Sequence, residues 1–514
     1  MLFANLISSG TAVAAAIIYL LGWIIYCRLF HPLRAIPGPF LASISRTWVV
    51  FKTWRGDMEH TQRALHAKHG YLVRIAPNEV ACSDPEAIKI IYGSKVVFNK
   101  TDYYDAWAPP NNGYVGHFPT RDEKKHAERR RIVNNVYSMS SVLESEKSID
   151  CCTQLFCETM RGFAKQKSVV DLGLWINMYT FDVLGELFYG SMFGFLRQHT
   201  DVGGYMKAID SLLPAFTIGG TLPSYLTKLY FLSTVILSPS VRGALGAVKH
   251  IEHASETAVE NRKRELEEID DGKHDMLRKM LEINADRGEK IDFTHQHICV
   301  ESHSSIFAGA DTTAIAINSI LYHLLRNPNA YTKLSSEIDT AIAKGTLSLP
   351  ISYAQAITLR YLKACINEGM RLHPSVGLTM PRVVPAGGTT ISGFYFPEGF
   401  RVGINGAVVQ YDTDVFGPDA EVFRPERWLE GDSARMEKTM LVFGAGGRTC
   451  IGKNISLSEI YKVIPQLVHL FRFRLVDPSK GWKTRNYWFN KQTDIHVFVE
   501  EREHALDSKA GSES

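Results

Sequence analysis

The chain begins with a long stretch that carries no charge. No charged side chain occurs before Arg28, and the run AVAAAIIYLLGWIIY, residues 12–26, is almost wholly apolar. A membrane-spanning helix needs about 20 such residues, so the pattern predicts one within residues 1–30. Basic residues follow the run and none precedes it, which favours a cytosolic position for everything after it. A cleaved signal peptide is the alternative, but the basic start and small-residue cleavage site that mark one are missing.

The pattern then changes to that of a mainly helical protein with small sheets. IPGP, residues 36–39, stiffens the chain, because each proline fixes φ and disfavours helix before it. Residues 70–100 read as two strands and a helix, and helical patterns dominate from 123 to about 343. Residues 376–409 contain strand-like runs between Gly and Pro, 455–472 return to helix, and 494–499 alternate like a strand.

Three segments follow from this pattern: a membrane anchor over 1–30, a proline-rich hinge over 31–40 and a mostly α (α+β) domain over 41–514. The length alone would allow about three domains. No long polar linker or repeat divides the chain after residue 40, so one large domain is equally consistent. The order of elements is not the regular βαβ alternation of a dinucleotide-binding sheet.

Composition narrows the function classes. The chain is 45% hydrophobic and 22% charged, and its net charge of +3 gives no indication of nucleic-acid binding. The eight cysteines include no C-x-x-C pair, which argues against zinc ribbons and a secreted disulfide framework. A reducing compartment fits, and it leaves cysteines free to act as thiols.

One thiol lies in an unusual setting. Residues 443–452 read FGAGGRTCIG, which places Cys450 in a glycine-lined loop just before a predicted helix. The helix N-terminus favours a thiolate and is expected to lower the pKa of the thiol, which suits a metal ligand. An inert core cysteine is the general alternative. A dinucleotide phosphate loop is a poor match, because Thr449 stands where the third glycine belongs.

This loop resembles the haem-binding loop of the cytochrome P450 monooxygenases, in which a Cys thiolate is the axial ligand of haem b. The resemblance implies that Cys450 binds the iron and that Phe443 lies beside it. The chain's strand-like segment 382–402 is also similar to fungal enzymes of secondary metabolism, including the pisatin demethylase group. The implied fold is a helical haem domain with small β-sheets, preceded by a transmembrane helix.

Other motifs match the same family in order and spacing. FAGADTT, residues 307–313, interrupts an apolar helix and resembles the family's oxygen-activating groove. The resemblance implies that Asp311 and Thr312 supply protons for cleavage of dioxygen, and that Gly309 leaves room for it. The alternative is a threonine that merely bonds to a carbonyl one turn earlier.

Arginine motifs extend the match. Glu368 and Arg371 share a helix face, and the resemblance implies that they join Arg427 in a buried structural network rather than a surface ion pair. It also implies that haem propionates bind four basic side chains: His126, Arg130, Arg382 and Arg448. His126 stands where the family commonly has Trp. The neighbouring basic residues form either a docking patch for an acidic redox partner or a solvated face.

The implied function is oxygen insertion into a lipophilic small molecule, by hydroxylation, demethylation or epoxidation, in fungal secondary metabolism. Electrons would come from NADPH through NADPH-cytochrome P450 reductase, with cytochrome b5 as a second candidate donor. The domain would face the cytosol from the endoplasmic reticulum membrane. The alternatives are a reductase-independent haem-thiolate isomerase or dehydratase, which tends to lose the acid–alcohol pair, and a non-catalytic haem-binding protein.

The substrate pocket is expected to be neutral and largely apolar. By resemblance it draws on residues 102–118, 212–232, 304–311, 375–381 and 487–489, with Phe307 and Val376 in direct contact. Aromatic and aliphatic side chains dominate these segments. Because a buried charge without a partner costs several kcal/mol, we expect an uncharged substrate that enters from the membrane side near 212–232.

Overall fold

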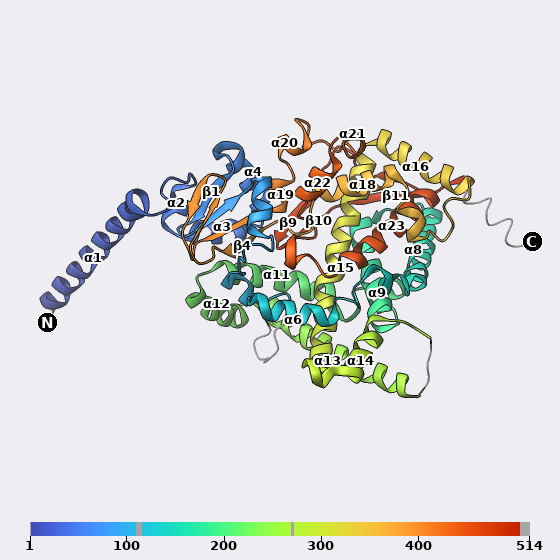
Figure 1. Ribbon diagram of the computed structural model, residues 1–514, viewed down its shortest axis with the longest axis horizontal. Coiled ribbons are helices and arrows are strands. Elements are labelled where there is room, and N and C mark those ends of the chain that lie inside the picture. Colours follow the sequence, from blue (N-terminus) through green and yellow to red (C-terminus); the bar gives the residue numbers. More distant parts are fainter. Residues whose placement is uncertain (1, 109–115, 269–271, 504–514) are drawn as a thin grey trace, which may run out of the picture.

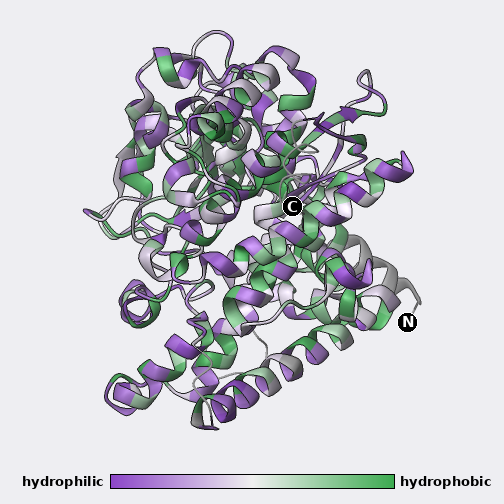
Figure 2. Ribbon diagram, turned by 90° about the vertical axis from the view of Figure 1, so that its right-hand side faces the viewer, coloured by the Kyte–Doolittle hydropathy of each residue, from purple (hydrophilic) through white to green (hydrophobic). Residues whose placement is uncertain are grey.

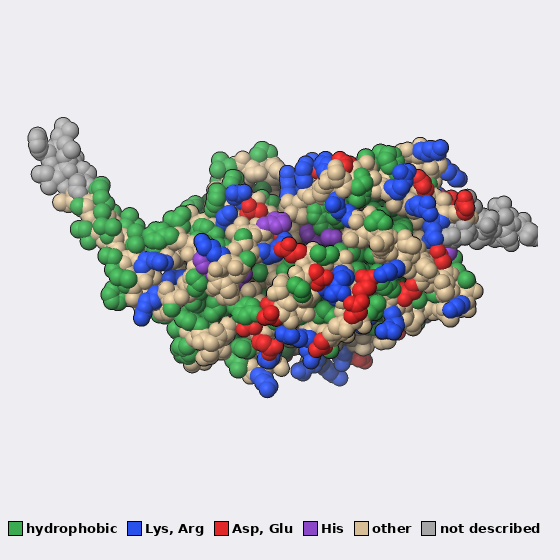
Figure 3. Space-filling view, turned by 90° about the horizontal axis from the view of Figure 1, so that it is seen from above, with side chains coloured by type: hydrophobic (Ala, Val, Ile, Leu, Met, Phe, Trp, Pro, Cys, Tyr) green, Lys and Arg blue, Asp and Glu red, His purple; other side chains and the backbone are tan. Residues whose placement is uncertain are grey.

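The computed structural model describes residues 2–108, 116–268 and 272–503. An isolated helix, α1 (Leu2–Ile25), projects from one end of a mostly helical body (Figure 1). The segment Thr11–Phe30 is long and apolar enough to cross a membrane, and almost none of it is buried against the body. This segment is compatible with the predicted anchor, and Figure 3 shows hydrophobic side chains along its described part, from residue 11 onward, and on the adjoining end of the body.

The first part of the body contains the helices α2 (Phe40–Ile44), α3 (Thr47–Arg55), α4 (Met58–His69), α5 (Ile88–Ile91), α6 (Glu123–Val133), α7 (Met139–Leu143), α8 (Glu146–Gln166), α9 (Leu172–Tyr189), α10 (Phe195–Gln198), α11 (Tyr205–Thr221), α12 (Ser224–Leu237), α13 (Pro239–Glu268) and α14 (Met276–Arg287). The second part contains α15 (His295–Arg326), α16 (Pro328–Ala343), α17 (Tyr353–Ala356), α18 (Arg360–Leu372), α19 (Gly406–Val409), α20 (Thr413–Phe416), α21 (Arg427–Glu430), α22 (Ser433–Thr439) and α23 (Lys453–Leu470). Surface helices alternate hydrophobic and hydrophilic residues (Figure 2), as one-sided burial requires.

The strands form four small sheets. Near the anchor, β1 (Leu72–Ala76), β2 (Glu79–Cys82), β7 (Arg401–Asn405) and β4 (Thr379–Val383) lie in that order, with only β2 and β7 parallel. A second sheet has the order β3 (Val170–Asp171), β11 (His496–Glu501), β8 (Phe471–Leu475). Two hairpins, β5 (Thr389–Ile391) with β6 (Phe394–Phe396) and β9 (Lys483–Tyr487) with β10 (Phe489–Thr493), complete the set. The predicted mostly α fold with small sheets is confirmed.

The core lies around α15, which crosses the middle of the body (Figure 1). It packs against α9, α18, α23 and β10. Both α9 and the second half of α15 are buried on nearly every side, which explains their almost continuous apolar sequence. Gly309 belongs to this packing, because a Cβ there would lie 3.1 Å from Leu184 Cδ1 of α9. The missing side chain allows this close contact between two helices, and the expectation that Gly309 leaves room for dioxygen stays a prediction.

A buried ionic cluster joins α18 to the segment that leads to Cys450. Arg371 Nε and Nη2 each donate to Glu368 at 2.8 Å, and Arg427 Nε donates to the same carboxylate at 2.9 Å. Trp428 Nε1 and the backbone N–H of Arg424 add two more donors, at 2.9 and 3.0 Å. The Glu368 side chain is fully enclosed, so the geometry is the buried network expected from the sequence.

The cluster extends toward the glycine-lined loop through Gln410. Arg371 Nη1 donates to the Gln410 carbonyl at 2.8 Å, and the Gln410 amide donates back to the Arg371 carbonyl at 2.8 Å. The Gln410 side-chain oxygen accepts the N–H of Leu441 at 2.8 Å, two residues before Phe443. The position of the loop therefore depends on the ion pair.

We expect Glu368→Gln to destabilise the fold by about 3–5 kcal/mol, because two buried arginines lose the charge that compensates them. Glu430→Gln is the matched control, since its carboxylate, 65% exposed, pairs with Arg424 on the same segment and should matter by less than about 1 kcal/mol. Denaturant unfolding measures both. Equal effects would contradict the assignment.

The effect of Glu368→Gln on the free energy of unfolding should depend on pH in a definite direction. Burial raises the pKa of Glu368, but Arg371 and Arg427 outweigh burial and hold it below its ordinary value. A depressed carboxyl pKa contributes stability above the unfolded value of about 4.3, and this contribution is lost as pH falls through the folded pKa. The difference in unfolding free energy between wild type and Glu368→Gln should therefore shrink below about pH 4.

Candidate functional site

Cys450 lies in a loop whose shape depends on its glycines. Its backbone N–H donates to the Phe443 carbonyl at 2.7 Å, which closes the loop. Gly444 and Gly446 have φ of 68° and 63°, and a Cβ on Gly446 would fall 1.8 Å from the Tyr92 carbonyl oxygen. Only glycine fits at position 446, both for its backbone angle and for this close approach.

The thiol of Cys450 remains open although the loop is packed into the body. The residue is exposed, whereas six of the other seven cysteines are buried. Although part of its surface is open, the protein atoms around the sulfur exclude water from it and raise the pKa of the Cys450 thiol, and the backbone N–H groups of Gly452 and Lys453 and the charge of Arg130 only partly oppose this. The expectation that the helix N-terminus lowers this pKa overall is therefore wrong for the protein without iron. A metal cation at the sulfur would supply the missing positive charge.

The central helix also has an open face. Ala308 is exposed and Thr312, one turn later, is partly exposed, although their neighbours are buried or nearly so. Thr312 Oγ1 donates to the Ala308 carbonyl at 2.8 Å, which is the plain alternative weighed for this threonine. Its own carbonyl accepts from Ser375 Oγ at 2.7 Å. The hydroxyl oxygen of Thr312 can still accept a hydrogen bond from a water at this face.

Asp311 points elsewhere. It is 2% exposed, and its Oδ1 accepts from Asn177 Nδ2 of α9 at 2.8 Å and lies 3.4 Å from Lys491 Nζ of β10. The sequence singled out neither partner, because both are distant in the chain. The pairing of Asp311 with Thr312 as acid and alcohol stays a prediction, with the carboxylate turned away from the open face.

Four basic side chains gather beside the glycine-lined loop. They are Lys100, Arg130, Arg382 and Arg448, and we call them the basic cluster. Lys100 and Arg382 are 4% exposed and face one another across an antiparallel bridge. Within the described part of the chain, the carboxylate that interacts with this cluster is Glu123, which binds Arg448 through two nitrogens at 2.7–3.0 Å.

Lys100 is a member that the sequence did not reveal. Its Nζ donates to the Phe118 carbonyl at 2.5 Å and lies 4.2 Å from the ring centres of both Tyr104 and Phe118. Burial and the charges of Arg382 and Arg448 hold its pKa well below the ordinary value. Arg382 Nη1 donates to Tyr104 Oη at 3.0 Å, so one tyrosine contacts both cations.

Arg130 of the cluster and the nearby His126, both predicted from the sequence, have different surroundings. Arg130 Nη1 donates to the Thr449 carbonyl, directly beside Cys450. His126 is buried, and burial together with neighbouring cations lowers its pKa to about 3, so the ring is neutral at physiological pH. A neutral imidazole still offers one N–H donor.

The site fits a haem with its two propionates. Four cations around one carboxylate leave an excess of buried positive charge, which is costly unless anions compensate it. Two propionates would do so, and the open thiol of Cys450 is the donor that a haem iron takes.

The two residues predicted to contact substrate are both partly buried and come from different elements. Phe307 stacks on His303 with ring centres 4.9 Å apart, on the same helix as Thr312. Val376 forms a backbone bridge with Phe489 and is partly exposed. Of the predicted pocket segment 102–118, residues 109–115 lie outside the described residues. The remainder contributes an aromatic group around Trp488, whose ring centre lies 5.5–6.1 Å from those of Tyr103, Tyr104, Trp107 and Phe118.

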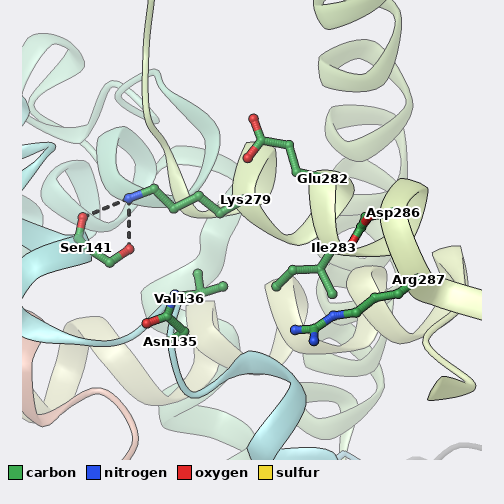
Figure 4. A pocket seen from close by; sticks show the side chains of 8 residues that line it. All are labelled: Asn135, Val136, Ser141, Lys279, Glu282, Ile283, Asp286 and Arg287. Carbon is green, nitrogen blue, oxygen red and sulfur yellow. Dashed lines mark hydrogen bonds between the residues drawn. The ribbon is translucent and has the colours of Figure 1, made fainter. Parts of the chain in front are cut away.

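Two polar surface pockets accompany the site. One, of about 660 Å³, is lined by Lys100 and Glu123 and so borders the basic cluster. The other, of about 300 Å³, lies between α14 and the segment around α7, where Lys279 Nζ donates to both oxygens of Ser141 at 2.8 Å (Figure 4). Lys279, Glu282, Asp286 and Arg287 give the second pocket mixed charge, and none of the predicted site residues lines it.

Comparison with known proteins gives a consistent result. The family model described as Cytochrome P450 matches residues 37–492. The chain is 44% identical to Cytochrome P450 monooxygenase gsfF of Penicillium aethiopicum, over 94% of this chain and 96% of that protein. It is 35% identical to Pisatin demethylase of Fusarium vanettenii, over 92% and 90%, and 35% identical to Cytochrome P450 monooxygenase cicH of Emericella nidulans, over 92% and 94%.

Replacing Cys450 by Ser should abolish the thiolate-type Soret band of the reduced carbon monoxide complex, because the hydroxyl remains neutral and is a poor iron ligand. Cys151→Ser is the control, since Cys151 is the other exposed cysteine of the described residues. Absorbance spectra of both purified variants decide the question. A normal band in Cys450→Ser would refute the assignment.

Lys100→Met should weaken haem retention by about tenfold or more, because a buried charge-assisted hydrogen bond is worth about 1.5–3 kcal/mol. Lys124→Met is the matched control, since Lys124 lines the same 660 Å³ pocket but is exposed. The rate of haem transfer to an acceptor apoprotein measures the effect. Equal rates in both variants would remove Lys100 from the haem site.

Proposed function

Because the chain belongs to the cytochrome P450 family and is a monooxygenase, we propose that it oxidises a neutral lipophilic molecule in fungal secondary metabolism with electrons from NADPH. The net reaction converts substrate C–H, dioxygen, NADPH and a proton into C–OH, water and NADP⁺. Demethylation and epoxidation use the same oxidant and electron supply. The proposal is carried by one combination of features. Helix α15 has an open face at Thr312, and the glycine-lined loop leaves the Cys450 thiol open.

Haem b, when bound, supplies an iron centre that takes up dioxygen and two electrons and breaks the O–O bond. We assign Cys450 as its protein ligand and the basic cluster, with His126, as the partners of its propionates. Phe443 closes the loop above the thiol through its carbonyl. Glu123 then shares Arg448 with a propionate, which keeps the arginine oriented when both are present.

Thr312 positions a water for proton delivery. Its hydroxyl hydrogen is directed to the Ala308 carbonyl, so its oxygen is the acceptor that a water at the open face can use. Ser375 fixes the backbone of the same residue from outside the helix. Asp311, which precedes Thr312 in the chain, is the acid that we propose for this pair, and its Oδ1 is held by Asn177 and lies near Lys491.

The side chains expected to surround the substrate favour a neutral molecule. Phe307, Val376 and the aromatic group around Trp488 offer rings and aliphatic carbon. The nearby charge of Asp311 is compensated by Lys491. Each buried CH₂ of a ligand contributes about 0.8 kcal/mol, whereas an unpaired ligand charge would cost several. Terpenoid, polyketide or alkaloid intermediates meet this requirement.

The outer surface supports membrane anchorage beside the substrate entrance. Helix α12 has no buried residue and exposes Tyr225, Leu229 and Ile236, by 80%, 64% and 62%. It lies at the same end of the body as α1, with Phe51 and Trp54 of α3 also exposed (Figures 1 and 3). We place the protein as a single-pass protein of the endoplasmic reticulum with its body in the cytosol. There, NADPH-cytochrome P450 reductase or cytochrome b5 can reach it.

The full-length protein with its reductase should convert a neutral lipophilic extract of the producing organism, and the aryl ether ethoxycoumarin as a defined probe. Products should carry oxygen from ¹⁸O₂ and require NADPH. Thr312→Ala should lower product per NADPH by about tenfold, with peroxide replacing product, because a proton relay is lost. Thr312→Ser should retain it. Turnover of a peroxide substrate without NADPH or reductase would favour the isomerase class instead.

A further inference from the structure

Three buried polar atoms near Trp488 have no hydrogen-bond partner among the described residues. They are Tyr103 Oη and Trp107 Nε1 of the 3₁₀ helix η3 (Asp102–Trp107) and Thr217 Oγ1 of α11. Tyr103 is 6% exposed and Thr217 is 0% exposed, whereas Trp107 is partly exposed. Because buried polar groups are normally paired, three unpaired groups in one place indicate a partner that the chain itself does not supply.

The fold brings these three atoms together. Helix α11 packs directly on η3, and a Cβ on Gly220 would lie 2.5 Å from the Tyr103 carbonyl oxygen. The ring centres of Tyr103 and Trp107 are 6.4 Å apart. Burial raises the pKa of Tyr103 well above its ordinary value, and the Thr217 hydroxyl and the Trp107 N–H oppose this rise, so both lie close to the Tyr103 hydroxyl. The three groups are neighbours that do not satisfy one another in the described structure.

Tyr103 and Trp107 belong to the aromatic group around Trp488, which is bonded to the proposed haem site from two directions. Tyr104 of this group accepts from Arg382 of the basic cluster at 3.0 Å. The Trp488 carbonyl accepts from the N–H of Gly377 at 3.2 Å, two residues after Ser375, which donates to the backbone of α15 at its open face. The aromatic group is therefore held beside the residues assigned to the propionates and beside the segment that borders Thr312.

The three unpaired groups have the ability to donate in common. The Trp107 N–H can only donate, and the hydroxyls of Tyr103 and Thr217 can each donate or accept. All three are uncharged, so they match a neutral oxygen with two lone pairs, such as a carbonyl oxygen. Ligand sites typically combine a mainly apolar wall with a few placed polar groups of this kind.

We propose that Tyr103, Trp107 and Thr217 bind a carbonyl oxygen of the substrate and so determine which lipophilic molecules the enzyme accepts. The inference rests on the proposed function, because it concerns the substrate of that reaction. The substrate class narrows from neutral lipophilic molecules to those that carry a ketone, lactone or quinone carbonyl. A ligand reaches the two enclosed hydroxyls from the side of Trp107, the member that is partly exposed.

A purely structural role predicts something different. If the three groups bond to one another or to an ordered water, the loss of one group changes how η3 packs on α11, and with it the affinity for every ligand. If they bind substrate, the loss of one group lowers the affinity only for ligands that carry the carbonyl. The ratio of two affinities therefore separates the two roles.

The test measures dissociation constants for two pairs of probes. The members of each pair share a ring shape and differ in the carbonyl: ethoxycoumarin against ethoxynaphthalene, and fluorenone against fluorene. Spin-state titration of the full-length haem enzyme gives the constants, and equilibrium dialysis gives them where the haem spectrum does not change. Apolar burial alone favours ethoxynaphthalene and fluorene. The expected result is the reverse, with the carbonyl member of each pair bound about three- to tenfold more tightly.

Three variants should remove this preference. Tyr103→Phe, Thr217→Val and Trp107→Phe each delete one donor and should lower the affinity ratio by about threefold or more. Thr221→Val is the matched control, since this hydroxyl lies one turn later on α11, is also buried and already donates to the Thr217 carbonyl at 2.8 Å. Its ratio should stay within about twofold of wild type. All four variants should keep the thiolate-type Soret band, which verifies that the haem site is intact.

Two results would overturn the proposal. One is a wild type that does not bind the carbonyl members more tightly, and the other is an equal loss of affinity for both members of a pair in the three variants. Neither measurement needs NADPH, reductase or dioxygen. An enzyme that shows the carbonyl preference but forms no oxygenated product with NADPH and reductase would instead overturn the proposed function, so the two failures are distinct.

Discussion

The buried carboxylate of Glu368 is the constraint on which the rest of the site depends. It accepts five donors from Arg371, Arg424, Arg427 and Trp428, and none of it contacts solvent. A buried ion pair gives little net stability compared with apolar packing, but it tolerates only one geometry. Here that geometry joins α18 to the segment before the glycine-lined loop, and Gln410 extends the connection to Leu441. These bonds position the loop from one end, and the hydrogen bond from the Cys450 N–H to the Phe443 carbonyl closes it around the thiol.

The basic cluster beside the loop differs from the Glu368 network in how its charge is compensated. Glu368 is satisfied within the protein, whereas the basic cluster is not, since among the described residues Glu123 forms an ion pair with Arg448 and no carboxylate forms one with the other three cations. Buried positive charge of this kind is stable only with anions. The charges around Glu368 therefore compensate one another within the protein, whereas the basic cluster is complementary to a ligand with two negative charges. This division explains why Arg448, two residues before the cysteine, belongs to the ligand side, while Arg371 and Arg427 do not.

Much of this could be predicted from the sequence, because it depends on short spacings. The structure contains the elements that four local patterns predict. These patterns are the apolar anchor, the helix around residue 311, the pair Glu368 and Arg371, and the glycine-lined loop. Contacts between distant residues leave no such pattern. Lys100 meets Arg382 across a bridge of 282 positions only through the fold, and Asp311 meets Lys491 in the same way. Gly309 shows the same limit: its lack of a side chain predicts a close neighbour, and only the fold identifies Leu184 as one.

The β9–β10 hairpin, which the sequence pattern did not predict, joins two parts of the chemistry. Its tip residue Trp488 has φ of 76°, a rare conformation for a residue with a side chain, and its ring contacts the aromatic group at the substrate side. Three residues later the same strand carries Lys491 to Asp311. Because β10 is bonded to α15 and to Ser375, the tip and the ammonium cannot shift independently. A ligand that displaces Trp488 therefore acts on the strand that holds Lys491 beside Asp311, so the aromatic group and this ion pair can only move together.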